Sequence, residues 1–173
     1  MKKIILALLI ATPSIASTIY DTPLKTIDGK ATTFAEFKGK TVLVVNTASG
    51  CGYNPQYAGL EKLYQKYKDK LVIIAFPCNQ FLFQEPGSNK DIQEFCTKNY
   101  GITFLLTSKI DVKGSGQHPV YQWLTSKAQN EKMDSEVKWN FQKYLINENG
   151  EWVTFFDSKI QPMDPSIIAA IEK

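Results

Sequence analysis

Three cysteines are the side chains of this sequence best suited to covalent chemistry: Cys51, Cys78 and Cys96. Cys51 stands between two glycines in the stretch NTASGCGYNPQY (46–57). A disulfide reductase with a Cys-x-x-Cys motif carries its second cysteine three residues after the first, but this chain has Asn54 at that position. Cys51 therefore lacks the local partner that exchange within one motif requires.

A thiol without a local partner can react with a peroxide instead. Only the thiolate attacks, and the N–H groups at the start of a helix predicted over 54–68 would favour the thiolate of Cys51. A buried structural cysteine in a strand-to-helix turn fits the same local pattern equally well. Peroxide would give a sulfenic acid that a distant thiol resolves, and N–H donors would stabilise the moving charge. The loops 76–87 and 138–141 contain such donors, from Gln, Asn and Trp side chains.

A strand–helix–strand unit is predicted to position Cys51. The continuous apolar runs 41–48 and 71–77 are typical of strands that are buried on both faces. Between them, the stretch 54–68 has apolar side chains at helical spacing. Two strands joined in this way form a parallel pair with a right-handed crossover, so Cys51 and the loop after residue 77 should share one edge of a sheet.

The rest of the chain predicts further helices and a hairpin. The expected elements are a helix over 88–99 that begins at a Ser88–Asp91 capping box, an extended stretch over 102–112, a short helix that begins at Pro119, a hairpin of strands 139–147 and 151–156, and a terminal helix that begins at Asp164 and Pro165. This order predicts an α/β protein with a thioredoxin-like fold, in which a central mixed β-sheet is flanked by helices.

The N-terminus has the pattern of a secretory signal peptide over residues 1–16. Lys2 and Lys3 precede the apolar run 4–11, and small residues lead to a cleavage site after Ala16. The apolar run is too short for an ordinary membrane span. We therefore expect an exported protein, periplasmic or secreted, with one domain over 17–173 and no stable membrane insertion.

Composition excludes two other classes of function. Without Lys2 and Lys3, 18 basic residues face 17 acidic ones, which argues against binding to nucleic acid. The cysteine spacings and the single histidine, His118, fit no zinc site. His118 precedes Pro119 and is expected to cap a helix rather than to serve as a general base, so we expect neither a metal nor a Cys–His hydrolase.

Several long motifs resemble the glutathione peroxidase family, in its cysteine-containing, thioredoxin-dependent form. They are VNTASGCGYNPQYAGLEKLYQKYKDK, AFPCNQF, QEPGS, FCTKNYGITF, KIDVKG, HPVYQWL and WNFQKYLI, in that order. The resemblance covers nearly the whole chain after residue 16. It implies an antioxidant peroxidase that reduces hydrogen peroxide and organic hydroperoxides without a metal or an organic cofactor.

The resemblance also implies roles for particular residues. The residues that match the family's catalytic tetrad are Cys51, Gln84, Trp139 and Asn140. Cys96 matches the resolving cysteine of the thioredoxin-dependent branch, and Cys78 matches a cysteine that is usually not needed for turnover. The expected cycle joins Cys51 and Cys96 in a disulfide that a reductant then opens.

Two departures from the family pattern bear on the reductant and the rim of the site. Leu82 and Phe83 stand where the family has glycine and a small or polar residue, so the rim should be narrower or more apolar. The stretch 123–139 is short and lacks the insertion of the tetrameric, glutathione-using members. We therefore expect a monomer or weak dimer that is reduced by a thioredoxin-like protein rather than by glutathione.

Cys96 presents a conflict between its pattern and its role. Its helical spacing with Ile92 and Phe95 predicts a buried core residue, whereas a disulfide needs Cα atoms roughly 5.5 Å apart. We therefore predict that the helix over 88–99 unwinds locally during turnover.

Two alternatives remain from the residues alone. The fold would also suit a thiol–disulfide oxidoreductase, although Asn54 argues against it. A redox-sensing, thioredoxin-like binding module that passes its oxidation to a client protein is the non-enzymatic alternative.

Overall fold

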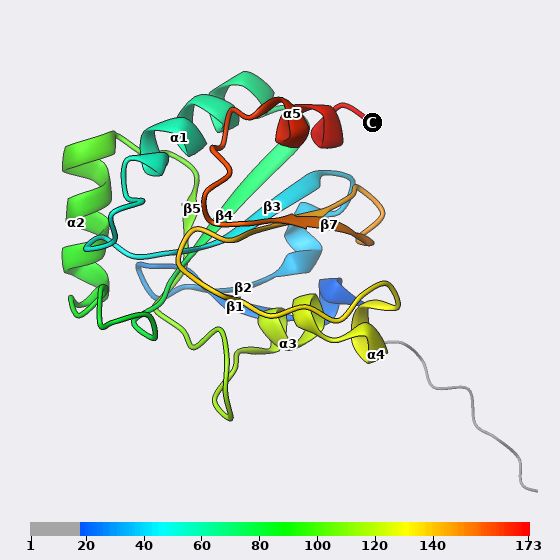
Figure 1. Cartoon of the computed structure of the whole chain (residues 1–173), viewed down its shortest axis with the longest axis horizontal. Helices are drawn as coiled ribbons and strands as arrows, with labels where there is room; N and C mark the ends of the chain where they lie inside the picture. The colour runs from blue at the N-terminus through cyan, green and yellow to red at the C-terminus, as the bar shows by residue number, and fades with distance from the viewer. Residues whose placement is uncertain (1–17) are drawn as a thin grey trace, which may run out of the picture.

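A mixed sheet of five strands forms the centre of the fold, in the order β5–β4–β3–β6–β7 (Figure 1). The computed structural model describes residues 18–173, so the predicted signal peptide over 1–16 lies outside the described residues. The strands are β3 (Thr41–Thr47), β4 (Leu71–Pro77), β5 (Leu105–Leu106), β6 (Lys143–Ile146) and β7 (Trp152–Phe156). β3 is parallel to β4 and antiparallel to β6, which confirms the predicted mixed sheet.

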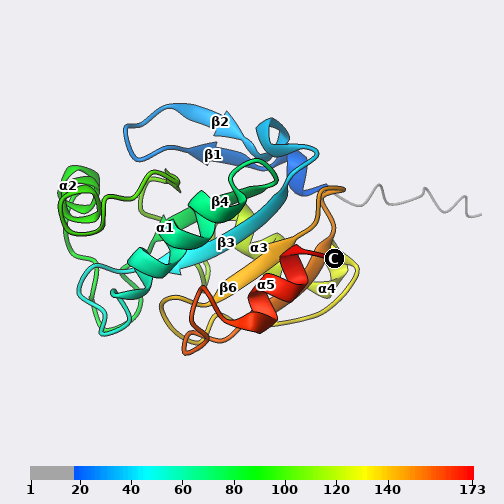
Figure 2. The ribbon, with the colours of Figure 1, turned by 90° about the horizontal axis from the view of Figure 1, so that it is seen from above.

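Helices cover both faces of this sheet. The remaining elements are η1 (Ile19–Asp21), β1 (Pro23–Lys25), β2 (Ala31–Thr33), η2 (Phe34–Phe37), α1 (Gln56–Tyr67), α2 (Asn89–Tyr100), α3 (Pro119–Thr125), α4 (Lys127–Asn130) and α5 (Pro165–Ile171). Figure 1 shows α1 and α5 on one side of the sheet and α3 and α4 on the other. Seen from above, α1 and α5 lie over the sheet, roughly along the direction of its strands, while α2 stands near the end of β3 that leads to Cys51 (Figure 2).

The sheet divides the interior into two apolar clusters because successive side chains of a strand point to opposite faces. Leu43 and Val45 of β3 pack with α1, α2 and α5 in the first cluster. Val42 and Val44 pack with α3 and with residues of η1, β1 and η2 in the second. The continuous apolar run of β3 is thus explained by burial on both faces.

The local signals in the sequence located most helices to within two residues. The capping box of α2 is present, with the Ser88 side chain accepting from the Asp91 N–H and the Asp91 carboxylate accepting from the Ser88 N–H. α3 begins at Pro119, and α5 follows the Asp164 cap as predicted. Among the residues that the structure describes, no helix is long and apolar enough to cross a membrane.

Two stretches that were predicted to be extended form shorter strands than expected. Of the stretch 102–112, only Leu105 and Leu106 form a strand. The residues that follow bond alternately to two neighbours: Thr107 N–H donates to Ala75 O of β4 at 3.0 Å, and Ser108 N–H donates to Lys25 O of β1 at 2.8 Å. The first hairpin strand begins at Lys143 rather than at residue 139, because Phe141 has a left-handed backbone with φ of 64°. β1, β2, α4 and the two 3₁₀ segments were not predicted.

Candidate active site

Cys51 lies in a buried turn between β3 and α1. Its side chain is 2% exposed, and the Tyr53 N–H donates to its Sγ at 3.4 Å. α1 begins only at Gln56, so the donor nearest the sulfur belongs to this turn rather than to the first turn of the helix. A backbone N–H group directed at the sulfur stabilises negative charge on it, as an N–H group in the first turn of a helix would.

Gln84 and Asn140 meet beside this turn. Asn140, which is fully buried, donates from Nδ2 to Gln84 Oε1 at 3.0 Å. The backbone carbonyl of Gln84 accepts from the Gly50 N–H at 2.9 Å. A Cβ atom at Gly50 would lie 2.9 Å from that carbonyl oxygen, so only glycine allows the two loops to approach this closely. Three segments that are distant in sequence thereby converge next to Cys51.

Trp139 is held on the same side of the site by its backbone and its ring. Its carbonyl accepts from Asn46 Nδ2 at 3.0 Å, and its ring packs against Phe81 with centroids 5.6 Å apart. Trp139 and Tyr53 line an open cleft of about 460 Å³. The structure therefore brings Gln84, Trp139 and Asn140 together around the loop that carries Cys51.

Glu85 was not predicted as a site residue, yet it fixes this loop. Its fully buried carboxylate accepts from the Ser49 N–H at 2.8 Å and from the Ser49 hydroxyl at 2.6 Å. Burial raises the pKa of the Glu85 carboxyl, and the Ser49 hydrogen bonds and the Lys109 ammonium offset part of the rise. Glu85, the residue after Gln84, thus holds Ser49, which lies two residues before Cys51.

Lys143 is a second residue that was not predicted. Its side chain is fully buried in β6, and its Nζ donates to Gln56 Oε1 at 2.6 Å, Phe141 O at 2.7 Å and Ile160 O at 2.8 Å. Burial lowers the pKa of Lys143 to about 7. Lys143 therefore connects the start of α1 to the backbone just after Asn140.

Cys96 and Cys78 occupy opposite sides of the sheet. Cys96 belongs to the same apolar cluster as Cys51 and is fully buried on α2, as its helical spacing predicted. Burial raises the pKa of the Cys96 thiol to about 11, the Glu85 carboxylate adds to the rise, and the nearby Tyr57 hydroxyl opposes it. Cys78 is fully buried in the other cluster, and all three cysteines are free thiols.

His118 is the cap of α3, in agreement with the sequence. Its Nδ1 accepts from the Val120 N–H at 3.3 Å, and burial lowers the pKa of the His118 imidazole. Within residues 18–173, no group of three or more histidine, cysteine or acidic side chains is arranged to hold a metal ion.

Leu82 and Phe83 project from the rim of the site. Their side chains are 74% and 81% exposed, so they leave the centre of the site open rather than narrowing it. Both residues have left-handed backbones, with φ of 51° and 54°. Glycine adopts this conformation without steric cost, whereas leucine and phenylalanine do so only with strain.

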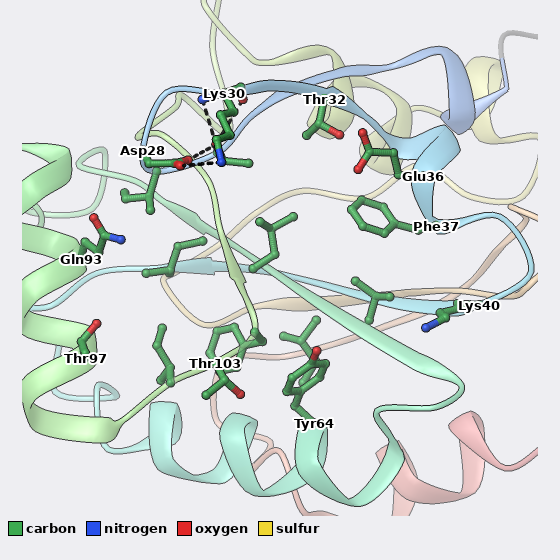
Figure 3. A pocket seen from close by; sticks show the side chains of 18 of the residues that line it. Asp28, Lys30, Thr32, Glu36, Phe37, Lys40, Tyr64, Gln93, Thr97 and Thr103 are labelled. Atoms are coloured by element: carbon green, nitrogen blue, oxygen red, sulfur yellow. Dashed lines mark hydrogen bonds and ion pairs between the residues drawn. The ribbon is translucent and has the colours of Figure 1, made fainter.

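A second cleft, of about 720 Å³, lies away from these residues (Figure 3). It opens between the β1–β2 hairpin, α1 and α2, with Asp28, Lys30 and Glu36 on its hairpin side and Gln93 and Thr97 on α2. None of the predicted catalytic residues lines it.

Comparison with known proteins gives a consistent set of relatives. Residues 19–125 match the family model described as glutathione peroxidase. A glutathione peroxidase-like peroxiredoxin of Schizosaccharomyces pombe is 51% identical over 148 residues, which cover 84% of this chain and 92% of that protein. A glutathione peroxidase of Lactococcus lactis is 46% identical over 144 residues, 83% of this chain and 91% of that one. The crystal structure of Trgpx in its apo form superposes with a TM-score of 0.70 at 35% identity, over 91% of this chain and 97% of the other, and confirms the predicted fold.

Proposed function

The chain belongs to the glutathione peroxidase family, and we propose that it reduces hydrogen peroxide and organic hydroperoxides through Cys51 and Cys96. Membership of this family makes the protein a thiol peroxidase, an oxidoreductase. The observation that best supports the residue assignment is the convergence of Gln84 and Asn140 on the loop of Cys51, through the 3.0 Å side-chain bond and the 2.9 Å contact at Gly50.

In the first step, the Cys51 thiolate attacks the distal oxygen of a hydroperoxide. An S–O bond forms and the O–O bond breaks, and the leaving alkoxide or hydroxide takes up a proton to give alcohol or water. Cys51 becomes a sulfenic acid. The N–H groups of Gln84, Trp139 and Asn140 would stabilise charge as it passes from sulfur to oxygen. The hydrogen bond from Asn140 occupies the oxygen of the Gln84 amide. The N–H₂ group at the other end of that amide points away from Asn140 and is not used by this bond.

In the second step, the Cys96 thiolate attacks the sulfur of the sulfenic acid. An S–S bond forms, the S–O bond breaks, and the oxygen leaves as hydroxide, which takes up a proton to give water. Cys96 is buried on the inner face of α2 in the reduced protein, so α2 must unwind locally to deliver it. We propose the peroxidatic role of Cys51, the resolving role of Cys96 and the unwinding of α2 together.

In the third step, a protein dithiol of thioredoxin type returns the disulfide to two thiols. The relatives named glutathione peroxidase-like peroxiredoxins, including that of S. pombe, support a protein reductant rather than glutathione. The short stretch 123–139 supports a monomer or weak dimer, which sedimentation analysis would test.

Rapid-mixing oxidation of the wild type, Cys51→Ser and Cys96→Ser tests the assignment. We expect Cys51→Ser to abolish the reaction with peroxide, and Cys96→Ser to keep the first oxidation but lose turnover with thioredoxin. Peptide mapping of peroxide-treated wild type should show a Cys51–Cys96 bridge. Unchanged turnover in Cys51→Ser, or a bridge to Cys78, would refute the proposed roles.

Export to the periplasm or the exterior is proposed from the sequence of residues 1–16. The full chain, expressed in bacteria, should be recovered from the periplasm in a form that begins at residue 17. A chain that starts at residue 17 serves as the cytoplasmic control. Recovery of the intact full chain from the cytoplasm would contradict export.

A further inference from the structure

The turn that carries Leu82 and Phe83 has two properties that seldom occur together. It exposes two adjacent large apolar side chains, by 74% and 81%, and it holds both in the left-handed region of backbone space. The strain is costly for residues with a Cβ atom, and the exposure gives no packing in return. A turn built only for stability would use glycine or asparagine at these positions.

This turn is joined to the loop that carries the reacting sulfur. On one side of the pair, Phe81 is buried against the Trp139 ring. On the other side, Gln84 contacts Gly50, the neighbour of Cys51, through the 2.9 Å backbone hydrogen bond. Leu82 and Phe83 are therefore anchored at both ends to residues of the site, while their own side chains point into solvent.

We propose that Leu82 and Phe83 are the contact residues for the protein dithiol that reduces the Cys51–Cys96 disulfide. This inference rests on the proposed function and extends it by naming the surface that the reductant occupies. In the reaction, a thiolate of the reductant attacks one sulfur of the disulfide and releases the other as a thiolate. The second thiol of the reductant then displaces the remaining sulfur, so two electrons pass and the reductant leaves as a disulfide.

The geometry of that intermediate argues for contact with the turn. A mixed disulfide brings two sulfurs to about 2.05 Å, and Cys51 is set in a turn where it is 2% exposed in the reduced protein. Even after α2 has unwound, a folded protein that reaches this turn has to contact the loops joined to it. Hydrogen peroxide is small enough to enter without touching the rim, so its reaction with Cys51 does not need the exposed pair.

The shape and charge of the turn favour a folded protein partner. Two convex apolar side chains suit a concave surface that removes them from water, as the anchors of protein interfaces do. The Lys113 ammonium lies 4.5 Å from the centre of the Phe81 ring. This cation beside the turn would complement a reductant with acidic groups around its apolar contact.

A double variant, Leu82→Asn with Phe83→Asn, tests the proposal without disturbing the backbone. Asparagine tolerates the left-handed conformation, so the turn should persist. Met133→Asn is the matched control, because Met133 is also an exposed apolar side chain, at 45%, in another loop. Three rates are measured: oxidation by hydrogen peroxide, reduction of the disulfide by dithiothreitol, and reduction by thioredoxin.

We expect the double variant to keep the first two rates within about twofold and to lose at least about tenfold in the third, as an interface does when its anchors are removed. The control should keep all three. An unchanged rate with thioredoxin, or no reduction of the wild type by thioredoxin, would overturn the proposal. A slower reaction of the double variant with cumene hydroperoxide alone would also overturn it, because the turn would then contact the substrate. Weaker binding of the double variant to anionic phosphatidylglycerol vesicles alone would overturn it too, because the turn would then contact a membrane surface. Absence of a Cys51-dependent reaction with peroxide in the wild type would instead refute the proposed function itself.

Discussion

Lys143 is a single residue that joins three parts of the active-site region. Its ammonium has three hydrogens and meets three oxygen acceptors, on Gln56, Phe141 and Ile160. Protonation is needed to satisfy all three acceptors, because the neutral amine has only two hydrogens. Burial acts in the opposite direction and lowers the pKa of Lys143 from 10.5 to about 7.

Lys143→Met should therefore change how stability depends on pH. Between about pH 7 and pH 10.5 the unfolded wild type holds a proton that the folded protein releases, so its free energy of unfolding rises with pH in this window relative to the variant. Urea unfolding of both proteins at a series of pH values across the window measures the difference. The variant also leaves three acceptors unpaired, at a cost of about 1–3 kcal/mol each when buried, but this cost does not vary with pH.

Lys159→Met provides the control for that measurement. Lys159 is an exposed lysine of the loop that follows β7, and its side chain is in water in both states. Its replacement should leave the pH dependence of unfolding as it is in the wild type. A constant stability difference between Lys143→Met and the wild type across the window would contradict the assigned pKa.

The sequence predicted some residues well and missed others for a physical reason. The capping box of α2 and the cap at His118 depend on contacts within three residues, so both can be predicted from a single sequence. Glu85 and Lys143 act on partners 36 and 87 residues away. A glutamate in a loop and a lysine in a strand look like solvated residues until the fold places them in the interior. The positions of Gln84, Trp139 and Asn140 came from family motifs, since their meeting depends on three separate loops.

At the scale of elements, α2 combines good end caps with a thinly packed body. Only Ile92 and Cys96 of its twelve residues are buried. At the C-terminal end of α2, the Tyr100 hydroxyl donates to Asn54 Oδ1 of the Cys51 turn at 2.9 Å. Unwinding would move Cys96 out of the surroundings that raise its thiol pKa to about 11. The same motion that delivers the resolving thiol therefore also favours its reactive, deprotonated form.

Ser88→Ala should accelerate formation of the Cys51–Cys96 disulfide. Loss of an N-cap side chain destabilises a helix by about 1 kcal/mol, which corresponds to a roughly fivefold larger population of the unwound state. If unwinding limits resolution, the rate of disulfide formation after a peroxide pulse should rise by a similar factor. Quenching with a thiol-alkylating reagent followed by peptide mapping measures this rate.

Asp164→Ala is the control at the same scale. Asp164 caps α5, accepting from the Ser166 N–H at 2.9 Å, and α5 carries no cysteine. This variant should lower global stability to a similar extent without accelerating the disulfide. A slower or unchanged rate in Ser88→Ala, or an equal acceleration in Asp164→Ala, would refute local unwinding of α2 as the limiting step.

At the scale of the whole molecule, the sheet determines which thiols can meet. Cys51 and Cys96 belong to the apolar cluster on one face, and Cys78 belongs to the cluster on the other. The parallel β3–β4 pair places the loops of Cys51 and Gln84 at one edge. The antiparallel pairing of β6 with β3 brings the residues before β6, Trp139 and Asn140, to the same edge. The strand–helix–strand unit was predictable from apolar runs, whereas the position of β6 next to β3 follows from long-range pairing that no local signal encodes.

This topology also sets the order in which the active site is assembled during synthesis. Asn140, which bonds to Gln84, lies 56 residues after it in the chain. At a translation rate of about 5–20 residues per second, roughly 3–11 s separate the two on the ribosome. Throughout that interval the nascent chain carries Cys51 without the amide that orients Gln84. The thiol is therefore made early and acquires its catalytic surroundings only when the last strands of the sheet emerge.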